Sequence, residues 1–271
     1  MVGRTGKSGC SLAGRCPRGD EPAARAGSRG VAASWPSANA GTTAGDLSGH
    51  HVRSRRGDAQ RLELPYIGDT SRDSRYLHGI ADNRISATGP IWRFVKHGFD
   101  VVAYDSRAHG DSDGEACTYG FYEKQDLGRV LDTIATGPIV LLGTSLGAAA
   151  LQHPAEDARV SAVVAAETFS DLRTVATERA PFFFSPDLIE RSFQLAERHG
   201  HFRIDTVSPV AAAATITAPV LLIHGEKDSE TPPDHSRRVF AALRGPKRLI
   251  IVPGAGHNGS LRADVWDEIE R

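Results

Sequence analysis

The amino-acid sequence predicts an α/β fold, built on a mostly parallel sheet with helices on both faces. From about residue 85 onward, short apolar runs typical of buried strands alternate with segments of helical pattern. Such alternation indicates a parallel sheet whose crossover helices cover both faces. One apolar run also ends in a glycine-flanked serine that opens a helix, a strand–turn–helix arrangement. The 271 residues suffice for one large domain of this class or two small ones.

The predicted elements follow one another in a regular order. The expected strands are Phe99–Tyr104, Ile139–Leu142, Ala162–Ala166, Val220–His224 and Arg248–Val252. Each is a short, mostly aliphatic run of the kind that forms a buried strand. The expected helices are Gly120–Thr136, Ser145–His153, Asp187–His199, His235–Leu243 and Leu261–Arg271.

The composition argues against several other classes of protein. The net charge is −1, with 24% charged and 40% hydrophobic residues, as in an ordinary globular protein. Neither a nucleic acid nor an acidic membrane surface is therefore an expected partner. The three cysteines (Cys10, Cys16 and Cys117) are too few and too scattered for a disulfide framework or a zinc knuckle. No apolar run approaches the roughly 20 residues of a membrane span. No signal peptide is visible, so we expect a cytoplasmic protein.

Residues 1–60 differ from the rest of the chain. They are rich in Gly, Ala, Ser, Arg and Pro, with almost no aliphatic clusters. Such a segment cannot bury enough apolar surface to offset its ordering entropy. We therefore expect a disordered extension before a domain that spans residues 61–271. The stretch 69–77 is nearly all polar, a poor sequence for a central strand. A second interpretation of the change in composition is that the early part is not the native in-frame sequence.

Ser145 is the predicted nucleophile. It stands in Gly143-Thr-Ser-Leu-Gly147, directly after an apolar run and before a run of alanines. A serine on such a sharp turn is presented over the end of the sheet, the arrangement called a nucleophile elbow. The alternative is a tight turn with an incidental serine.

A serine hydroxyl needs a base, and the base needs an acid that orients it. Both should lie on loops after strands, in the chain order serine, acid, histidine. Asp228, on the loop after Val220–His224, is the predicted acid, with Glu226 and Glu230 as fallbacks. A carboxylate there could instead cap the next helix. His257, on a glycine-rich loop after the last strand, is the predicted base. The alternative for His257 is an ordinary surface histidine.

Two backbone N–H groups should stabilise the oxyanion of the reaction. The N–H of Leu146, directly after the nucleophile, is the first predicted donor. The second is the N–H of Ile80, in the segment Leu77-His-Gly-Ile80. Gly79 would let the backbone approach the substrate, and His78 would brace this substrate-binding loop. His-Gly is also a common turn pair, so this segment alone would carry little weight.

Residues 77–257 resemble the α/β-hydrolase superfamily, and within it the branch of small serine esterases, monoacylglycerol-lipase-like and serine aminopeptidase-like proteins. The resemblance rests on His78-Gly79, on 105–112 (Asp-Ser-Arg-Ala-His-Gly-Asp-Ser), on 143–147, on Ser208-Pro209, on 218–228 and on Gly256-His257. It implies the α/β-hydrolase fold and a structural turn in which Arg107 pairs with Asp105. The first two strands usual in this family are not recognisable.

The resemblance also implies a small helical cap, at about residues 168–207. Three consecutive phenylalanines, Phe182, Phe183 and Phe184, stand there between two prolines. They could line an acyl or aryl pocket or pin the cap onto the core. Asp171, which follows a strand, is an alternative acid ranked below Asp228.

Together these features predict a serine hydrolase that cleaves a small-molecule ester through a Ser145–His257–Asp228 triad and an acyl-enzyme, with no metal or cofactor implied. The alternatives are a peptidase or thioesterase with the same triad, and a non-catalytic or truncated protein on this fold. The sequence does not indicate the substrate's chain length or the oligomeric state.

Overall fold

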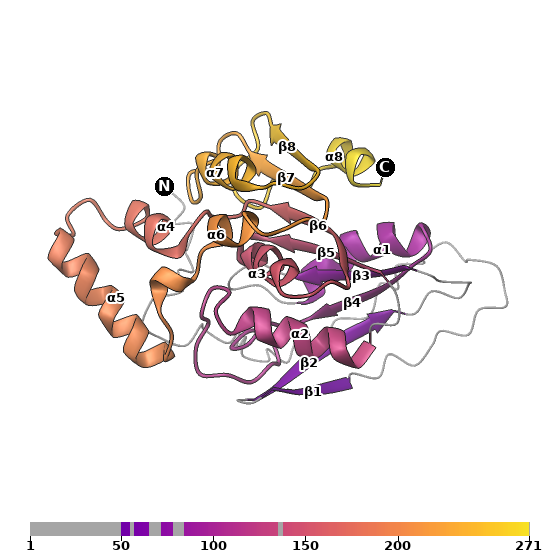
Figure 1. Ribbon diagram of the computed structural model, residues 1–271, viewed down its shortest axis with the longest axis horizontal. Helices are drawn as coiled ribbons and strands as arrows, with labels where there is room; N and C mark the ends of the chain where they lie inside the picture. The colour runs from indigo at the N-terminus through magenta and orange to yellow at the C-terminus, as the bar shows by residue number, and fades with distance from the viewer. Residues whose placement is uncertain (1–49, 55–56, 65–71, 78–83, 135–137, 271) are drawn as a thin grey trace, which may run out of the picture.

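The computed structural model describes residues 50–54, 57–64, 72–77, 84–134 and 138–270, which form an eight-stranded sheet with helices around it (Figure 1). The strands are β1 (His50–Ser54), β2 (Gly57–Leu64), β3 (Arg72–Leu77), β4 (Phe99–Tyr104), β5 (Ile139–Thr144), β6 (Val160–Ala166), β7 (Val220–Gly225) and β8 (Lys247–Val252). Their order is β1-β2-β4-β3-β5-β6-β7-β8. β2 pairs antiparallel with β1 and β4, and the other pairs are parallel. The predicted fold class is confirmed.

Helices pack on both faces of this sheet (Figure 1). The helices are α1 (Thr88–Lys96), α2 (Glu123–Ile134), α3 (Ala148–Gln152), α4 (Leu172–Glu178), α5 (Pro186–Gly200), α6 (Pro209–Ala213), α7 (Asp234–Ala242) and α8 (Ala263–Ile269). Residues of α2, α3, α6 and α7 share one apolar cluster with the sheet. Residues of α1 and α8 share the other. In β4, Val102 and Tyr104 belong to the first cluster, and Val101 and Ala103 to the second. Both faces of the strand are therefore buried from Val101 to Tyr104, which explains the run of apolar residues there.

The strands predicted from apolar runs are β4 to β8, and each boundary lies within two residues of the prediction. The predicted helix Ser145–His153 is instead divided into two 3₁₀ turns, Ser145–Gly147 and His153–Ala155, with the short α3 between them. Its first residue has a left-handed backbone, with φ of 50° at Ser145, and cannot belong to a regular helix.

β3 corrects the expectation that residues 69–77 make a poor central strand. Residues 72–77 pair with β4 on one side, and residues 73–77 pair with β5 on the other, both in parallel register. Hydrogen bonding on both edges uses backbone groups that every residue carries, so strand context overrides weak side-chain propensity. β1 and the first residues of β2 also lie within residues 1–60. The part of the expected extension that the structure describes, from His50 onward, therefore forms strands, and the boundary at residue 61 stays a prediction.

The segment between β6 and β7 forms a cap beside the sheet (Figure 1). α4, α5 and a 3₁₀ turn at Ile204–Thr206 surround an apolar cluster that includes Phe169, Phe193 and Phe202, and aromatic residues before α2 also pack against it. Asp171 caps α4 by accepting from the Thr174 N–H at 2.8 Å. Ser185 caps α5 in the same way, with proline in the first turn.

The turn after β4 is held by a buried carboxylate, but not through the predicted pair. Asp105 accepts from the backbone N–H of Arg84 at 2.7 Å, from the Arg84 guanidinium and from the Asp111 N–H at 3.0 Å. Arg107 pairs instead with Asp126 of α2, at 2.6 Å. The predicted Arg107–Asp105 pair is therefore wrong, because a second arginine and a second aspartate, distant in sequence, lie closer. Gly110 has φ of +50°, and a side chain there would run into the Asp105 carboxylate.

Glu123, the first residue of α2, organises the turn before this helix. Its buried carboxylate accepts from the Thr118 N–H at 2.7 Å, the Thr118 hydroxyl at 2.6 Å and the Gly120 N–H at 2.9 Å. This turn carries Cys117 and Tyr119, which pack on Leu146 beside the predicted nucleophile. Glu123 thus holds the turn whose side chains pack on Leu146, next to the predicted nucleophile.

Replacing Glu123 with Gln should destabilise the fold, because one acceptor oxygen becomes an amide that faces a donor. We expect a loss of about 1–3 kcal/mol in the free energy of unfolding, measured by urea denaturation. Glu115→Gln, at an exposed position nearby, is the matched control and should change it by less than about 0.5 kcal/mol. Equal losses in the two variants would contradict the role of Glu123.

Candidate active site

Ser145 stands at the carboxyl end of β5 in a left-handed backbone conformation, with φ of 50°. A non-glycine residue seldom adopts this conformation, and it is typical of a nucleophile elbow. Ser145 is 9% exposed. At Gly147 a Cβ would meet no atom of the described residues within 4 Å.

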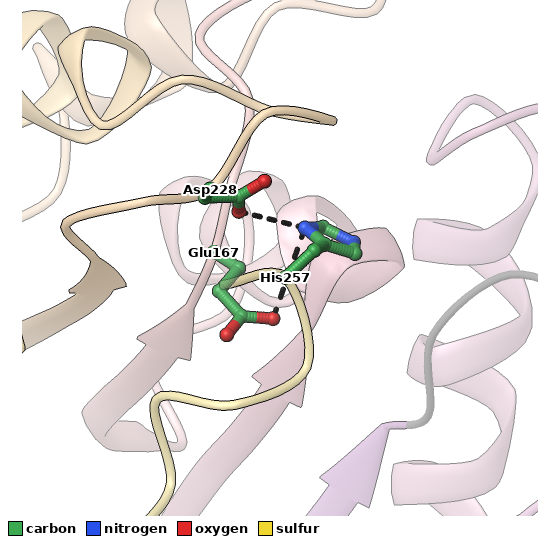
Figure 2. A group of neighbouring side chains, drawn as sticks. All are labelled: Glu167, Asp228 and His257. Carbon is green, nitrogen blue, oxygen red and sulfur yellow. Dashed lines mark hydrogen bonds and ion pairs between the residues drawn. The ribbon is translucent and has the colours of Figure 1, made fainter. Parts of the chain in front are cut away.

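The structure brings Ser145, His257 and Asp228 together in one hydrogen-bonded chain. His257 Nε2 lies 3.2 Å from the Ser145 hydroxyl, and His257 Nδ1 lies 2.7 Å from Asp228 Oδ2. Figure 2 shows the Asp228 carboxylate directed at the imidazole. When Nδ1 donates its proton to Asp228, Nε2 of the neutral ring is left as an acceptor that faces the hydroxyl. This is the arrangement that a general base for a serine requires.

Asp228 is held in place by its own loop and by β7. Its Oδ1 accepts from the N–H groups of Glu230 and Thr231, each at 2.9 Å. His224 Nε2 lies 3.3 Å from Oδ2. Burial alone would raise the pKa of Asp228, but hydrogen bonds from His224, His257 and the Thr231 N–H outweigh burial and hold the pKa well below its usual range. The carboxylate therefore stays ionised beside the imidazole.

Burial alone would lower the pKa of His257, but its hydrogen bond to Asp228, with the charges of Asp228, Glu167 and Glu230, raises the pKa above 6.5. The stability that comes from His257 is fully present below its unfolded pKa and is lost as the pH rises through the folded value. The contribution of Asp228 is present above its unfolded pKa of 3.8 and is lost as the pH falls toward the lower folded value. Asp228 and His257 therefore stabilise the fold most between the unfolded pKa of Asp228, 3.8, and the unfolded pKa of His257, 6.5.

Glu167 is a residue of the site that the sequence analysis did not identify. It follows β6 directly, is 1% exposed and lies 3.9 Å from His257 Nδ1 (Figure 2). No motif marks it. A usable signal was its position as a carboxylate directly after a strand in the parallel part of the sheet, since such strands end at the same edge.

The other candidate acids have different partners. Glu226 is exposed and accepts from the Gly254 N–H at 2.9 Å. Glu230 pairs with Arg179 at 3.2 Å. Asp171 caps α4 and also accepts from the Ser170 hydroxyl. Of the predicted acids, only Asp228 is hydrogen-bonded to His257 among the residues that the structure describes.

The predicted oxyanion loop cannot be compared with the structure, since His78, Gly79 and Ile80 lie outside the described residues. Leu146, the other predicted donor, is 2% exposed and packs with Cys117 and Tyr119. Its position directly after Ser145 is the one that the elbow requires of a donor.

Of the three consecutive phenylalanines, Phe182 and Phe183 are exposed, on the loop between α4 and α5 at the outer end of the cap (Figure 1). Phe182 is 99% exposed and Phe183 is 71% exposed, and neighbouring rings contact one another edge to face. These two residues therefore do not pin the cap onto the core, which corrects that alternative. Phe184 is half-buried.

A ring nitrogen of His257 and one carboxylate oxygen each of Glu167 and Asp228 lie within 4.8 Å of one another, a spacing at which three side chains could hold a metal ion. Each side chain is already in hydrogen bonds, however: the Glu167 and Asp228 carboxylates accept backbone N–H groups, and Asp228 also bonds the imidazole. The group is thus organised as a hydrogen-bond network around a histidine.

A model of the alpha/beta hydrolase family matches residues 76–269. The chain belongs to this family. The uncharacterized protein YqkD of Bacillus subtilis (strain 168) is 30% identical over 224 residues, which cover 78% of this chain and 69% of that protein. The 2-(acetamidomethylene)succinate hydrolase of Mesorhizobium japonicum is 25% identical over 261 residues, which cover 79% of this chain and 92% of that enzyme.

Solved structures of the alpha/beta hydrolase family share the fold. An esterase of Pyrococcus furiosus superposes with a TM-score of 0.63 at 19% identity, and the match covers 82% of this chain and 87% of that one. Est1E of Butyrivibrio proteoclasticus, solved with ferulic acid bound, gives a TM-score of 0.66 at 16% identity and covers 82% and 96%. Among the described residues, no helix is both long and apolar enough to cross a membrane.

The contact between His257 and Asp228 predicts a measurable pKa. In an NMR titration of the imidazole, we expect His257 to titrate above 6.5 in the wild type, because the Asp228 carboxylate stabilises the imidazolium. Asp228→Asn should lower this pKa. An unchanged His257 pKa in the folded variant would mean that the two side chains are not paired in solution.

Proposed function

We propose that this protein is a serine hydrolase that cleaves carboxylic esters of small molecules through an acyl-enzyme. The observation that carries the proposal is the chain from Asp228 through His257 to Ser145, with contacts of 2.7 and 3.2 Å, on a serine with φ of 50°. Membership of the hydrolase family and structural similarity to an esterase support it.

In the proposed reaction, His257 Nε2 takes the proton of Ser145 as the hydroxyl oxygen attacks the ester carbonyl. Asp228 stabilises the imidazolium that forms. The oxyanion of the tetrahedral intermediate would accept from the N–H groups of Leu146 and Ile80. His257 then gives its proton to the leaving alcohol as the ester bond breaks.

Water completes the reaction by the same steps. His257 takes a proton from a water molecule, which attacks the acyl group on Ser145, and the acid product leaves as the serine regains its proton. Each step uses groups of this chain alone. Peptides and thioesters would follow the same course, so ester specificity has to come from the pocket rather than from the triad.

Hydrolysis of p-nitrophenyl acetate, butyrate and octanoate, compared with Ser145→Ala, tests the proposal. We expect the variant to lose roughly 10⁴-fold or more in kcat, because the proposed acyl-enzyme forms on the Ser145 hydroxyl, which the variant lacks. Ser229→Ala, at an exposed position, is the matched control and should keep full activity. Inactivity of a folded wild type toward all three esters would overturn the ester assignment, and peptide and thioester substrates would then be assayed.

We also propose that the phenylalanines of the cap contact the acyl or aryl part of the substrate, since exposed rings gain free energy when an apolar group covers them. Phe182→Ala combined with Phe183→Ala should raise KM for the octanoate ester several-fold and leave acetate hydrolysis unchanged. Trp92→Ala removes an aromatic ring that is 67% exposed on α1 and serves as the control. Equal KM values for octanoate in all three proteins would contradict this role.

A further inference from the structure

Glu167 combines a strained backbone with a buried carboxylate, and the Ser145–His257–Asp228 triad by itself requires neither. Its backbone is left-handed, with φ of 57°, a conformation that is unfavourable for a residue with a side chain. Its own N–H donates to the Ile223 carbonyl of β7 at 2.8 Å, so the strained residue is fixed against the sheet. A buried carboxylate held in this way is costly unless its hydrogen bonds are satisfied.

The partners of the Glu167 carboxylate, among the described residues, all belong to the loop that carries His257. Oε2 accepts from the Asn258 N–H at 2.6 Å, and Oε1 accepts from the Ser260 N–H at 3.1 Å. The carboxylate thus bridges the residues directly after the histidine. Asn258 is itself left-handed, with φ of 62°, so the loop turns sharply at the point that Glu167 holds.

The same carboxylate is a second negative charge at the imidazole. Figure 2 shows Glu167 and Asp228 on the same side of His257, where Nδ1 lies 3.9 Å from Glu167 Oε2 and 2.7 Å from Asp228 Oδ2. Within the part of the chain that the structure describes, the charged groups that act on His257 are Glu167 after β6, and Asp228 and Glu230 on the loop after β7. The other ring nitrogen faces the Ser145 hydroxyl.

Sheet order explains why Glu167 reaches this point. β6 lies between β5, which ends at the nucleophile, and β7, which ends at the acid loop. The first residue after β6 is therefore placed between the two functional loops. A carboxylate at this position can touch the histidine loop without displacing either Ser145 or Asp228.

We propose that Glu167 is a positioning residue for His257: its carboxylate fixes the loop that carries the imidazole and shares with Asp228 the stabilisation of the imidazolium. The effect on the reaction rate rests on the proposed hydrolase function. The effect on the protonation of His257 does not, and it can be measured without a substrate.

The first test is an NMR titration of the His257 imidazole in the wild type, Glu167→Gln and Glu226→Gln. Glu226 is the matched control because its carboxylate also accepts a backbone N–H near His257, that of Gly254, but it is exposed. We expect the pKa of His257 to fall in Glu167→Gln and to stay unchanged in Glu226→Gln. An unchanged pKa in Glu167→Gln would overturn the shared stabilisation. If the glutamine variant does not fold, Glu167→Asp keeps the charge at a greater distance and should give a smaller decrease.

The second test is the pH profile of ester hydrolysis. We expect kcat of Glu167→Gln to fall roughly 10-fold. In metalloenzymes, residues that orient a functional histidine contribute roughly 10- to 100-fold, and we take the lower end of that range. The acidic limb of kcat/KM should also move to lower pH, because a less basic His257 stays neutral there. A decrease in kcat/KM by the same factor at every pH would mean that Glu167 only holds the loop. This result would overturn the proposal that Glu167 stabilises the imidazolium. A wild type without esterase activity would count against the proposed function, and the titration would still decide the role of Glu167.

Discussion

The parallel pairing of β5, β6, β7 and β8 is the constraint on which the rest of the site depends. Parallel strands end at one edge of a sheet, so the residues that follow them meet there, although Ser145 and His257 are 112 positions apart in sequence. The order of the strands becomes the order of the functional groups: nucleophile, Glu167, Asp228 and His257. The apolar clusters on both faces keep this edge in register.

The central strands could be predicted because apolar packing on both faces of the sheet makes each of them a mostly apolar run. The three predicted triad residues could be located for a related reason. Each follows the end of such a run, and Ser145 and His257 are also flanked by glycines. Their chemical roles remain predictions, whereas their proximity is a property of the fold.

Other features left no such signal. β3 is held by backbone hydrogen bonds on both edges, and those bonds do not depend on side-chain type, so its polar sequence concealed it. Arg107 pairs with Asp126 because α2 packs next to the turn after β4, and no motif in the local sequence predicts that packing. Glu167 acts through a loop 91 residues away. Its place directly after a predicted strand was the one signal along the chain, and the contact with the histidine loop follows only from the order of neighbouring strands.

Left-handed backbone at non-glycine residues recurs in this site, at Ser145, Glu167 and Asn258. Strain of this kind costs on the order of 1–3 kcal/mol per residue, and glycine would relieve it at the expense of the side chain. The strained backbone of the site therefore removes part of the stability that its hydrogen bonds supply. Glu167 and Ser145 differ in this respect, because the Glu167 carboxylate also satisfies two backbone N–H groups of the neighbouring loop. A relative that kept this sheet without the proposed chemistry would have no use for the strained serine, so glycine at position 145 would be the mark of such a relative.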